Sequence, residues 1–212
     1  MDMFCCVEPD KREELQLELD PHRERPATAL TAQTFQVSVD YEGRKLGVDL
    51  DSSDLLRGLM VKAVFPEGLL ADWNLAHPDN PVRPYDKIFE VNGEAGTAEH
   101  LEAKIASSGR QLKMAFRRPQ LREISMRRTG SLGVKLLYKK SSTGIVINEI
   151  LSDGLFSDWN EEHPAQQVVP GDRIVAVGGE QMGAEELFKR ISRDDPLDLA
   201  VLHYDQATCH RR

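Results

Sequence analysis

The chain has 212 residues, of which 40% are hydrophobic and 29% charged, and its formal net charge is −8 at pH 7. A chain of this length can bury a core and can form one or two domains. Its hydrophobic content is too high for a disordered protein, and no apolar run approaches the roughly 18 residues needed to cross a bilayer. The acidic balance argues against nucleic acid as the main partner.

The cysteines and the first residues of the chain point to a reducing compartment. Three cysteines, Cys5, Cys6 and Cys209, do not make a framework of disulfides. No apolar segment typical of a secretory signal follows the first methionine, because residues 8–14 are mostly charged. We therefore expect a cytoplasmic protein.

An internal repeat with an offset of 86 residues is the strongest signal in the sequence. The segment Leu-Gly-Val at residues 46–48 recurs at residues 132–134, and the two tryptophans, Trp73 and Trp159, occupy the same repeat position. The repeat predicts four segments along the chain: a flexible acidic tail over residues 1–32, a first domain over residues 33–118, a second domain over residues 119–205, and a C-terminal tail over residues 206–212.

Each copy predicts the same order of elements: two strands, a buried third strand, a short helix, a strand between two turns, a longer helix and a closing strand. In the first copy these elements cover residues 34–40, 46–50, 59–65, 68–74, 84–93, 97–107 and 112–116. In the second copy they cover residues 121–127, 132–136, 144–151, 154–160, 170–179, 183–193 and 197–201. The pattern predicts a mainly β fold with two helices per domain, in which each domain forms a small, partly open barrel or sandwich.

The order of these motifs resembles the PDZ domain, once in each copy. Residues 170–179 are similar to the family's segment Gly-Asp-x-Ile-x-x-Val-Asn-Gly, with Gly178 in place of Asn. The first copy keeps Asn92 and Gly93 but has Tyr85 in place of the first glycine. The resemblance covers nearly the whole chain outside the N-terminal tail. It implies two tandem PDZ-like domains that bind the C-terminal peptides of other proteins.

The resemblance also implies where a peptide would bind. In the family, the ligand adds as an antiparallel strand to the second strand, opposite the longer helix, and its carboxylate lies in the loop before that strand. The family's loop has two glycines that alternate with apolar residues, whereas both copies here keep only the second glycine. The alternative is that this glycine serves only the entry to a strand. The corresponding residues are Lys45, Leu46, Gly47, Val48 and Leu50 in the first copy, and Ser131, Leu132, Gly133, Val134 and Leu136 in the second.

The longer helix is expected to set the ligand class. Its first groove-facing residue is often His in the family, but it is Ala98 in the first copy and Ala184 in the second, which favours an apolar side chain two residues before the ligand's end. One turn later, Glu102 of the first copy would repel a carboxylate, whereas Phe188 of the second offers an aromatic wall. The remaining groove-facing residues are Ile105 and Ile191.

A basic residue before the loop separates the two copies further. In the family it often helps to hold the carboxylate; Arg127 takes this position in the second copy, and Tyr41 in the first. An exposed arginine within the basic stretch of residues 117–128 is an equally weighted alternative. We therefore expect the second copy to bind C-termini with apolar final residues, and the first to be weaker, differently specific or mainly structural.

The histidines do not predict a metal site. His77 and His163 each precede a proline, and no further ligand recurs with them at metal-binding spacing, so we expect a structural turn with the histidine near the tryptophan. His100 lies two residues after Ala98, about 200° around the helix, and is expected to face away from the groove. No catalytic or cofactor-binding motif is recognisable, so we expect neither enzymatic activity nor a cofactor.

The sequence thus predicts a non-enzymatic scaffold or adaptor. The alternative is a regulatory or membrane-peripheral module that contacts lipid headgroups or folded proteins through the first domain and the basic residues 117–128. Acylation of Cys5 and Cys6 would be a second route to weak membrane association, although reduced cysteines are the favoured interpretation. The basic stretch has no interleaved aromatic residues, so nucleic acid is not expected as a partner.

Overall fold

The computed structural model describes residues 33–54 and 58–205. The two predicted tails, with Cys5, Cys6 and Cys209, lie outside the described residues. Along the part of the chain that is described, no helix is both long enough and apolar enough to span a bilayer.

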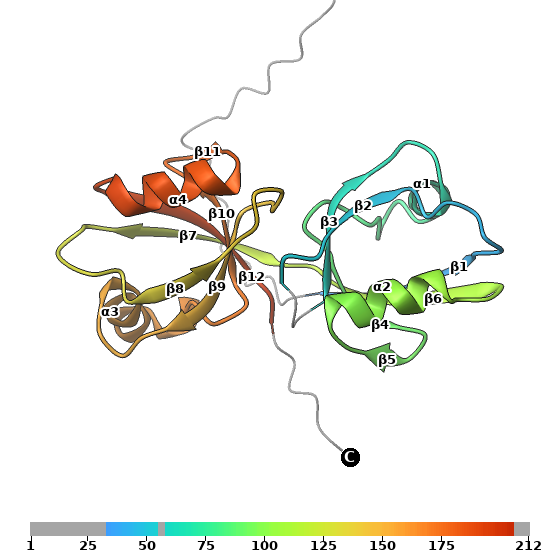
Figure 1. Ribbon diagram of the computed structural model, residues 1–212, viewed down its shortest axis with the longest axis horizontal. Coiled ribbons are helices and arrows are strands. Elements are labelled where there is room, and N and C mark those ends of the chain that lie inside the picture. Colours follow the sequence, from blue (N-terminus) through green and yellow to red (C-terminus); the bar gives the residue numbers. More distant parts are fainter. Residues whose placement is uncertain (1–32, 55–57, 206–212) are drawn as a thin grey trace, which may run out of the picture.

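Two antiparallel sheets with the same strand order form the framework (Figure 1). The first sheet has the order β1 (Thr34–Asp40), β6 (Gln111–Arg117), β4 (Lys87–Val91), β3 (Leu59–Val64) and β2 (Val48–Asp51), and the short β5 (Glu94–Ala95) pairs with β4. The second sheet has the order β7 (Gln120–Met126), β12 (Leu197–His203), β10 (Arg173–Val177), β9 (Ile145–Ile150) and β8 (Val134–Leu137), and β11 (Glu180–Gln181) pairs with β10. In both sheets the second strand along the chain therefore lies at an edge.

Each sheet is accompanied by two α-helices, as the sequence predicts. The first sheet carries α1 (Leu69–Ala76) and α2 (Ala98–Ala106), and the second carries α3 (Leu155–Glu162) and α4 (Ala184–Arg193). A 3₁₀ turn (Pro164–Gln166) after α3 was not predicted. The predicted fold class, mainly β with two helices in each of two similar domains, is confirmed by this element order and topology.

The alternation of apolar residues places one side of each strand in a separate core. In the first sheet, Val37 of β1 and Leu112 and Phe116 of β6 are fully buried, and Leu101 of α2 packs into the same cluster. The second sheet has its own cluster, built from repeat-equivalent positions such as Leu187 of α4. Two cores of this kind explain why the repeat preserves the spacing of apolar residues most strictly.

The strands β2 and β8 are shorter than predicted. Both were expected to begin at a leucine, but they begin at Val48 and Val134, directly after a glycine with a positive φ of 75° (Gly47) or 65° (Gly133). Each strand has only four residues and contains a shift in register against its neighbour. A left-handed residue cannot continue a regular strand, so the glycine ends the loop and sets the strand's first residue.

The repeated histidines have the structural role that the sequence predicts. The ring of His77 stacks on that of Trp73 with 3.6 Å between centroids, and its Nδ1 lies 3.0 Å from the backbone oxygen of the same tryptophan. His163 repeats this arrangement on Trp159, with 3.7 Å between ring centroids. Within residues 33–54 and 58–205, no group of three or more His, Cys, Asp or Glu side chains is placed to hold a metal ion.

Two leucines of α1 test the position of the first core. Leu70 is fully buried, whereas Leu75 in the same helix is 84% exposed. We expect Leu70→Ala to lower the free energy of unfolding of the first domain by about 2 to 5 kcal/mol, because it leaves a cavity. Leu75→Ala should change it by less than about 0.5 kcal/mol. Urea denaturation followed by Trp73 fluorescence, with Trp159 replaced by Phe, measures both; equal effects of the two substitutions would contradict the assigned core.

Candidate functional site

The loop before each edge strand is fixed by a close contact between two glycines. A Cβ on Gly47 would lie 2.3 Å from the backbone oxygen of Glu67, and a Cβ on Gly68 would lie 2.6 Å from the Cα of Gly47. In the second domain, a Cβ on Gly133 would lie 2.2 Å from a backbone oxygen, and one on Gly154 would lie 2.6 Å from the Gly133 nitrogen. Only glycine fits at these four positions, so the loop and the start of the short helix have a fixed mutual position.

Next to this contact, the loop's carbonyl groups accept hydrogen bonds, whereas two of its N–H groups have no acceptor among the described residues. The carbonyl groups of Lys45 and Leu46 accept hydrogen bonds from the first N–H groups of α1, at 3.1 and 3.0 Å, and Gly47 accepts one from Phe65 at 2.9 Å. In contrast, the N–H groups of Leu46 and Gly47 have no acceptor among the described residues. Unpaired, successive N–H groups in such a loop form a concave site that suits an anion.

The second domain repeats this arrangement with one difference. Ser131 and Leu132 accept hydrogen bonds from the start of α3, at 3.0 and 3.1 Å, and Leu132 N–H has no acceptor among the described residues. The N–H of Gly133 donates to the hydroxyl oxygen of Ser131 at 3.3 Å. Ser131 is exposed, so its side chain can rotate away and release this donor to a ligand.

The structure gathers most of the predicted groove residues around the two cores. Leu46, Val48, Leu50 and Ile105 are partly buried and pack on the cluster that contains Ala98. In the second domain, three residues of the loop and strand (Leu132, Val134 and Leu136) pack in the same way on the cluster that contains Ala184 and Ile191. An apolar surface thus continues from each loop along the edge strand toward the longer helix.

The charged residues predicted for the first peptide site are at the protein surface. Lys45 and Glu102 are both exposed. A hollow of about 490 Å³ opens at the loop, and Lys45, Gly47, Phe65 and Glu67 contribute to its lining. This hollow therefore holds one carboxylate as well as one ammonium group. The net attraction for an anion is consequently smaller than the lysine alone would provide.

Phe188 and Arg127 are the two predicted residues that distinguish the second groove. Phe188 on α4 is 40% exposed, and its ring lies 5.4 Å, centroid to centroid, from that of Tyr138, which directly follows β8. Arg127 is exposed and has no ion-pair partner among the described residues. Tyr138 was missed by the sequence reasoning, because a contact between the helix and the end of the strand is set by the tertiary fold.

Arg128, which follows Arg127, was also missed. Its guanidinium donates hydrogen bonds to the backbone oxygens of Ile191 and Asp194 at the end of α4, and its own N–H donates to the Asp195 carboxylate at 3.0 Å. Cations commonly bind the free carbonyl groups at a helix C-terminus in this way. Arg128 thus connects the segment before the loop with the helix on the other side of the groove.

Other arginines of the basic stretch also have internal partners. Arg118 donates two hydrogen bonds, each of 2.9 Å, to the Asp86 carboxylate, and its side chain is only 19% exposed. Arg117 lies over the Phe89 ring, with 4.6 Å to the ring centroid. The basic residues 117–128 therefore do not form one free cationic surface.

His100 faces away from the first groove, as the sequence predicts. Its Nε2 lies 3.4 Å from the Glu94 carboxylate on β5, and its backbone N–H donates to the Thr97 hydroxyl, which caps α2. Its ring would also meet any Cβ placed on Gly96. The histidine is therefore part of the connection between β5 and α2.

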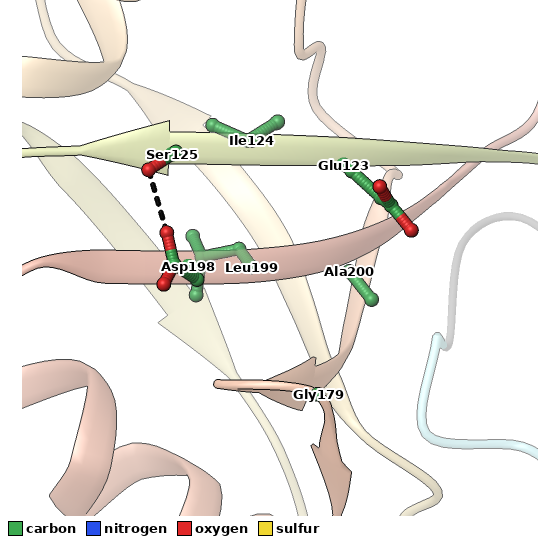
Figure 2. A pocket seen from close by; sticks show the side chains of 7 residues that line it. All are labelled: Glu123, Ile124, Ser125, Gly179, Asp198, Leu199 and Ala200. Atoms are coloured by element: carbon green, nitrogen blue, oxygen red, sulfur yellow. Dashed lines mark hydrogen bonds between the residues drawn. The ribbon is translucent and has the colours of Figure 1, made fainter. Parts of the chain in front are cut away.

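A separate hollow lies along β7 and β12 of the second sheet. It has a volume of about 260 Å³, and its lining includes Glu123, Ser125 and Asp198 (Figure 2). The Ser125 hydroxyl donates a hydrogen bond to the Asp198 carboxylate at 2.5 Å. None of the residues predicted for peptide binding lines this hollow. The loops before β2 and β8 remain the candidate binding sites.

No family model matches the chain, and no curated protein matches it. Among solved structures, it is similar to INAD PDZ45 in complex with NG2 peptide, with 16% sequence identity, coverage of 85% of this chain and 96% of that chain, and a TM-score of 0.33. The complex of INAD PDZ45 and NORPA CC-PBM gives 15% identity, coverage of 81% and 92%, and a TM-score of 0.34. Dlg1 PDZ2 of the choanoflagellate Monosiga brevicollis gives 24% identity, coverage of 39% and 90%, and a TM-score of 0.30.

Two glycines of the second domain test the loop geometry. We expect Gly133→Ala to lower the free energy of unfolding of this domain by about 2 kcal/mol or more, because alanine is unfavourable at a left-handed φ and its Cβ would meet backbone atoms. Gly130→Ala should cost less than about 0.5 kcal/mol, since a Cβ there meets nothing within 4 Å. Urea denaturation followed by Trp159 fluorescence, with Trp73 replaced by Phe, checks both values. A Gly133→Ala variant as stable as the parent would refute the glycine contact.

Proposed function

We propose that this chain is a non-enzymatic tandem PDZ adaptor that binds the C-terminal peptides of other proteins. The observation that carries the proposal is the combination, in each domain, of an edge strand with a preceding loop in which at least one N–H group has no acceptor among the described residues: Leu46 and Gly47 in the first domain, and Leu132 in the second. An edge strand offers unpaired backbone groups to a further strand, and the loop offers donors to a carboxylate. A peptide with a free C-terminus satisfies both at once.

The mechanism is strand addition followed by side-chain selection. The peptide runs antiparallel to β2 or β8, and its carboxylate accepts hydrogen bonds from the loop N–H groups. Its last side chain packs on the loop leucine, which is Leu132 in the second domain and itself packs on the cluster that contains Ile191. Apolar final residues are favoured because this surface is apolar and continuous with the core.

The two domains differ at positions that a ligand would touch. Phe188 adds an aromatic surface to the second groove, and the unpaired Arg127 adds positive charge near the loop. The first groove has Glu102 at the position of Phe188 and Glu67 in the hollow at its loop. We therefore assign the tighter binding of C-termini to the second domain. Two grooves on one chain also permit bivalent capture of a partner that presents two C-termini.

Removal of the peptide's terminal charge tests the proposed mechanism. The probe is a decapeptide that ends in Phe-Lys-Val, prepared with a free carboxylate and, as the matched control, with a terminal amide. Hydrogen bonds to a charged group contribute about 1.5 to 3 kcal/mol, so we expect the amidated peptide to bind at least about tenfold more weakly. Isothermal titration calorimetry with the full chain measures both. Equal affinities would exclude carboxylate recognition and favour a surface that contacts lipids or folded proteins.

Substitutions at one helix position test the ranking of the domains. We expect Phe188→Ala to weaken binding of the free peptide to the second domain by about tenfold, because it removes a packing surface worth about 1 to 2 kcal/mol. The equivalent Glu102→Ala should leave the second domain unchanged and strengthen the first about twofold, because it removes a repulsive charge. Chemical-shift titration of the labelled full chain resolves the two grooves. Binding by the first domain that equals or exceeds that of the second would overturn the ranking.

A further inference from the structure

A buried arginine of the second sheet has acceptors in the first domain. Arg173 begins β10 and is fully buried. Its Nη1 donates to the Asp51 carboxylate at 3.0 Å and to the backbone oxygen of Thr143 at 2.8 Å, and both terminal nitrogens lie 3.2 Å from the Ser53 hydroxyl. A buried guanidinium needs such acceptors, because its transfer out of water is costly.

The main acceptor, Asp51, is the last residue of β2, the strand to which a peptide would add in the first domain. Its Oδ1 accepts the N–H of Ser53 and its Oδ2 accepts the N–H of Thr143, both at 2.7 Å. Burial by itself would raise the pKa of Asp51, but the charge of Arg173 and the hydrogen bonds outweigh it and hold this pKa below its usual value. The carboxylate is therefore ionised at neutral pH, and it holds the end of β2 against the second domain.

The order of the strand β2 depends strongly on the contacts that hold its two ends. It has four residues, pairs only with β3, and shifts register between Asp49 and Leu50. Its first residue follows the loop that the Gly47 contact fixes, and its last residue is the one held by Arg173. A short edge strand with an irregular centre gains much of its order from such anchors.

The rest of the contact between the domains has the character of a specific interface. The Tyr204 hydroxyl of the second domain donates to the backbone oxygen of Tyr85 at 2.9 Å, and the Lys87 ammonium lies 3.9 Å from the Tyr204 ring centroid. Burial raises the pKa of Tyr204, so its hydroxyl remains a donor. Lys87 also pairs with Asp54 at 3.0 Å, and both side chains are at most 5% exposed.

Several residues at this interface can be compared with their equivalents in the other copy of the repeat. Lys87 and Arg173 occupy the same repeat position, and both are buried between the domains. Tyr85 has a φ of +74°, whereas the equivalent residue of the second copy is Gly171. A tyrosine in this conformation is unfavourable and is retained where the surrounding structure holds it. Figure 1 shows the two domains side by side, with the connection between β8 and β9, which contains Thr143, directed toward the first domain.

We infer that Arg173 is a positioning residue for the peptide-binding strand of the other domain. By holding Asp51, it keeps the end of β2 in the conformation to which a peptide can add. The affinity of the first groove thus depends on a side chain of the second domain that touches no ligand. This inference rests on the proposed function, but the order of β2 can be measured without any ligand.

The test uses the full chain labelled with ¹⁵N and three variants. Arg173→Met keeps the length of the side chain and removes its charge, and Arg173→Lys keeps the charge but loses the fork that reaches several acceptors. Arg190→Met is the matched control, because Arg190 also belongs to the second domain but pairs with carboxylates of that same domain, Glu180 and Asp194, each at 2.7 Å.

In Arg173→Met we expect the amides of Asp49 and Asp51, which face β3 in the antiparallel ladder, to exchange hydrogen at least tenfold faster, while those of β1 and β6 keep their protection. The decapeptide that ends in Phe-Lys-Val should bind the first groove at least threefold more weakly and the second groove unchanged. Arg173→Lys should give intermediate values, and Arg190→Met should leave β2 as in the parent. Unchanged exchange in β2 of the folded Arg173→Met variant would overturn the inference.

The outcomes separate this inference from the proposed function. Faster exchange in β2, with no peptide bound by either groove, would support the positioning role and refute the proposed function. If Arg173→Met does not fold, Asp51→Asn takes its place: the amide can still accept the two N–H groups but loses the ion pair. Unchanged exchange of the Asp49 amide in this variant, or faster exchange spread evenly over the whole first sheet, would then overturn the inference.

Discussion

The loop before the edge strand of each domain is shaped by the contact between two glycine backbones. Gly133 and Gly154 approach so closely that a Cβ on either would lie within 2.6 Å of backbone atoms of the other segment. Because α3 begins at this point, its first N–H groups donate hydrogen bonds to the carbonyl oxygens of the loop. The loop's own N–H groups do not take part in these bonds. The same contact sets the first residue of β8 and therefore the register of the edge strand. The site proposed for a carboxylate and the edge proposed for a peptide thus have one physical origin.

Much of this could be predicted from the sequence, because the repeat shows which residues each copy keeps. The alternation in residues 34–40 and the helical spacing of Ala98, Leu101 and Ile105 are local patterns, and they predict β1 and α2 correctly. The roles of Gly68 and Gly154 were missed, although their recurrence at the same offset was a signal. Contacts between distant segments, such as Tyr138 with Phe188, have no local pattern and follow only from the folded arrangement.

The contact between the domains was also outside the reach of sequence reasoning. A basic residue after the aspartate of each turn, Lys87 or Arg173, is typical of an exposed strand end, yet both are buried. Their burial depends on acceptors such as Asp51 and Asp54, which lie far away in the sequence. Tyr85, which the sequence shows only as a departure from the family's glycine, forms part of this interface. At these repeat positions, the two copies therefore differ where one domain contacts the other.

The short, irregular edge strands have a consequence for the behaviour of the chain in concentrated solution. An exposed sheet edge can pair with the same edge of another molecule and start a growing assembly. Here β2 and β8 offer only four residues each, and the shift in register interrupts even these. Charged side chains stand on both strands, Asp49 paired with Lys62 and Lys135 paired with Glu149, and they disfavour pairing of like with like. An edge this short and this charged is therefore a poor template for the growth of an assembly.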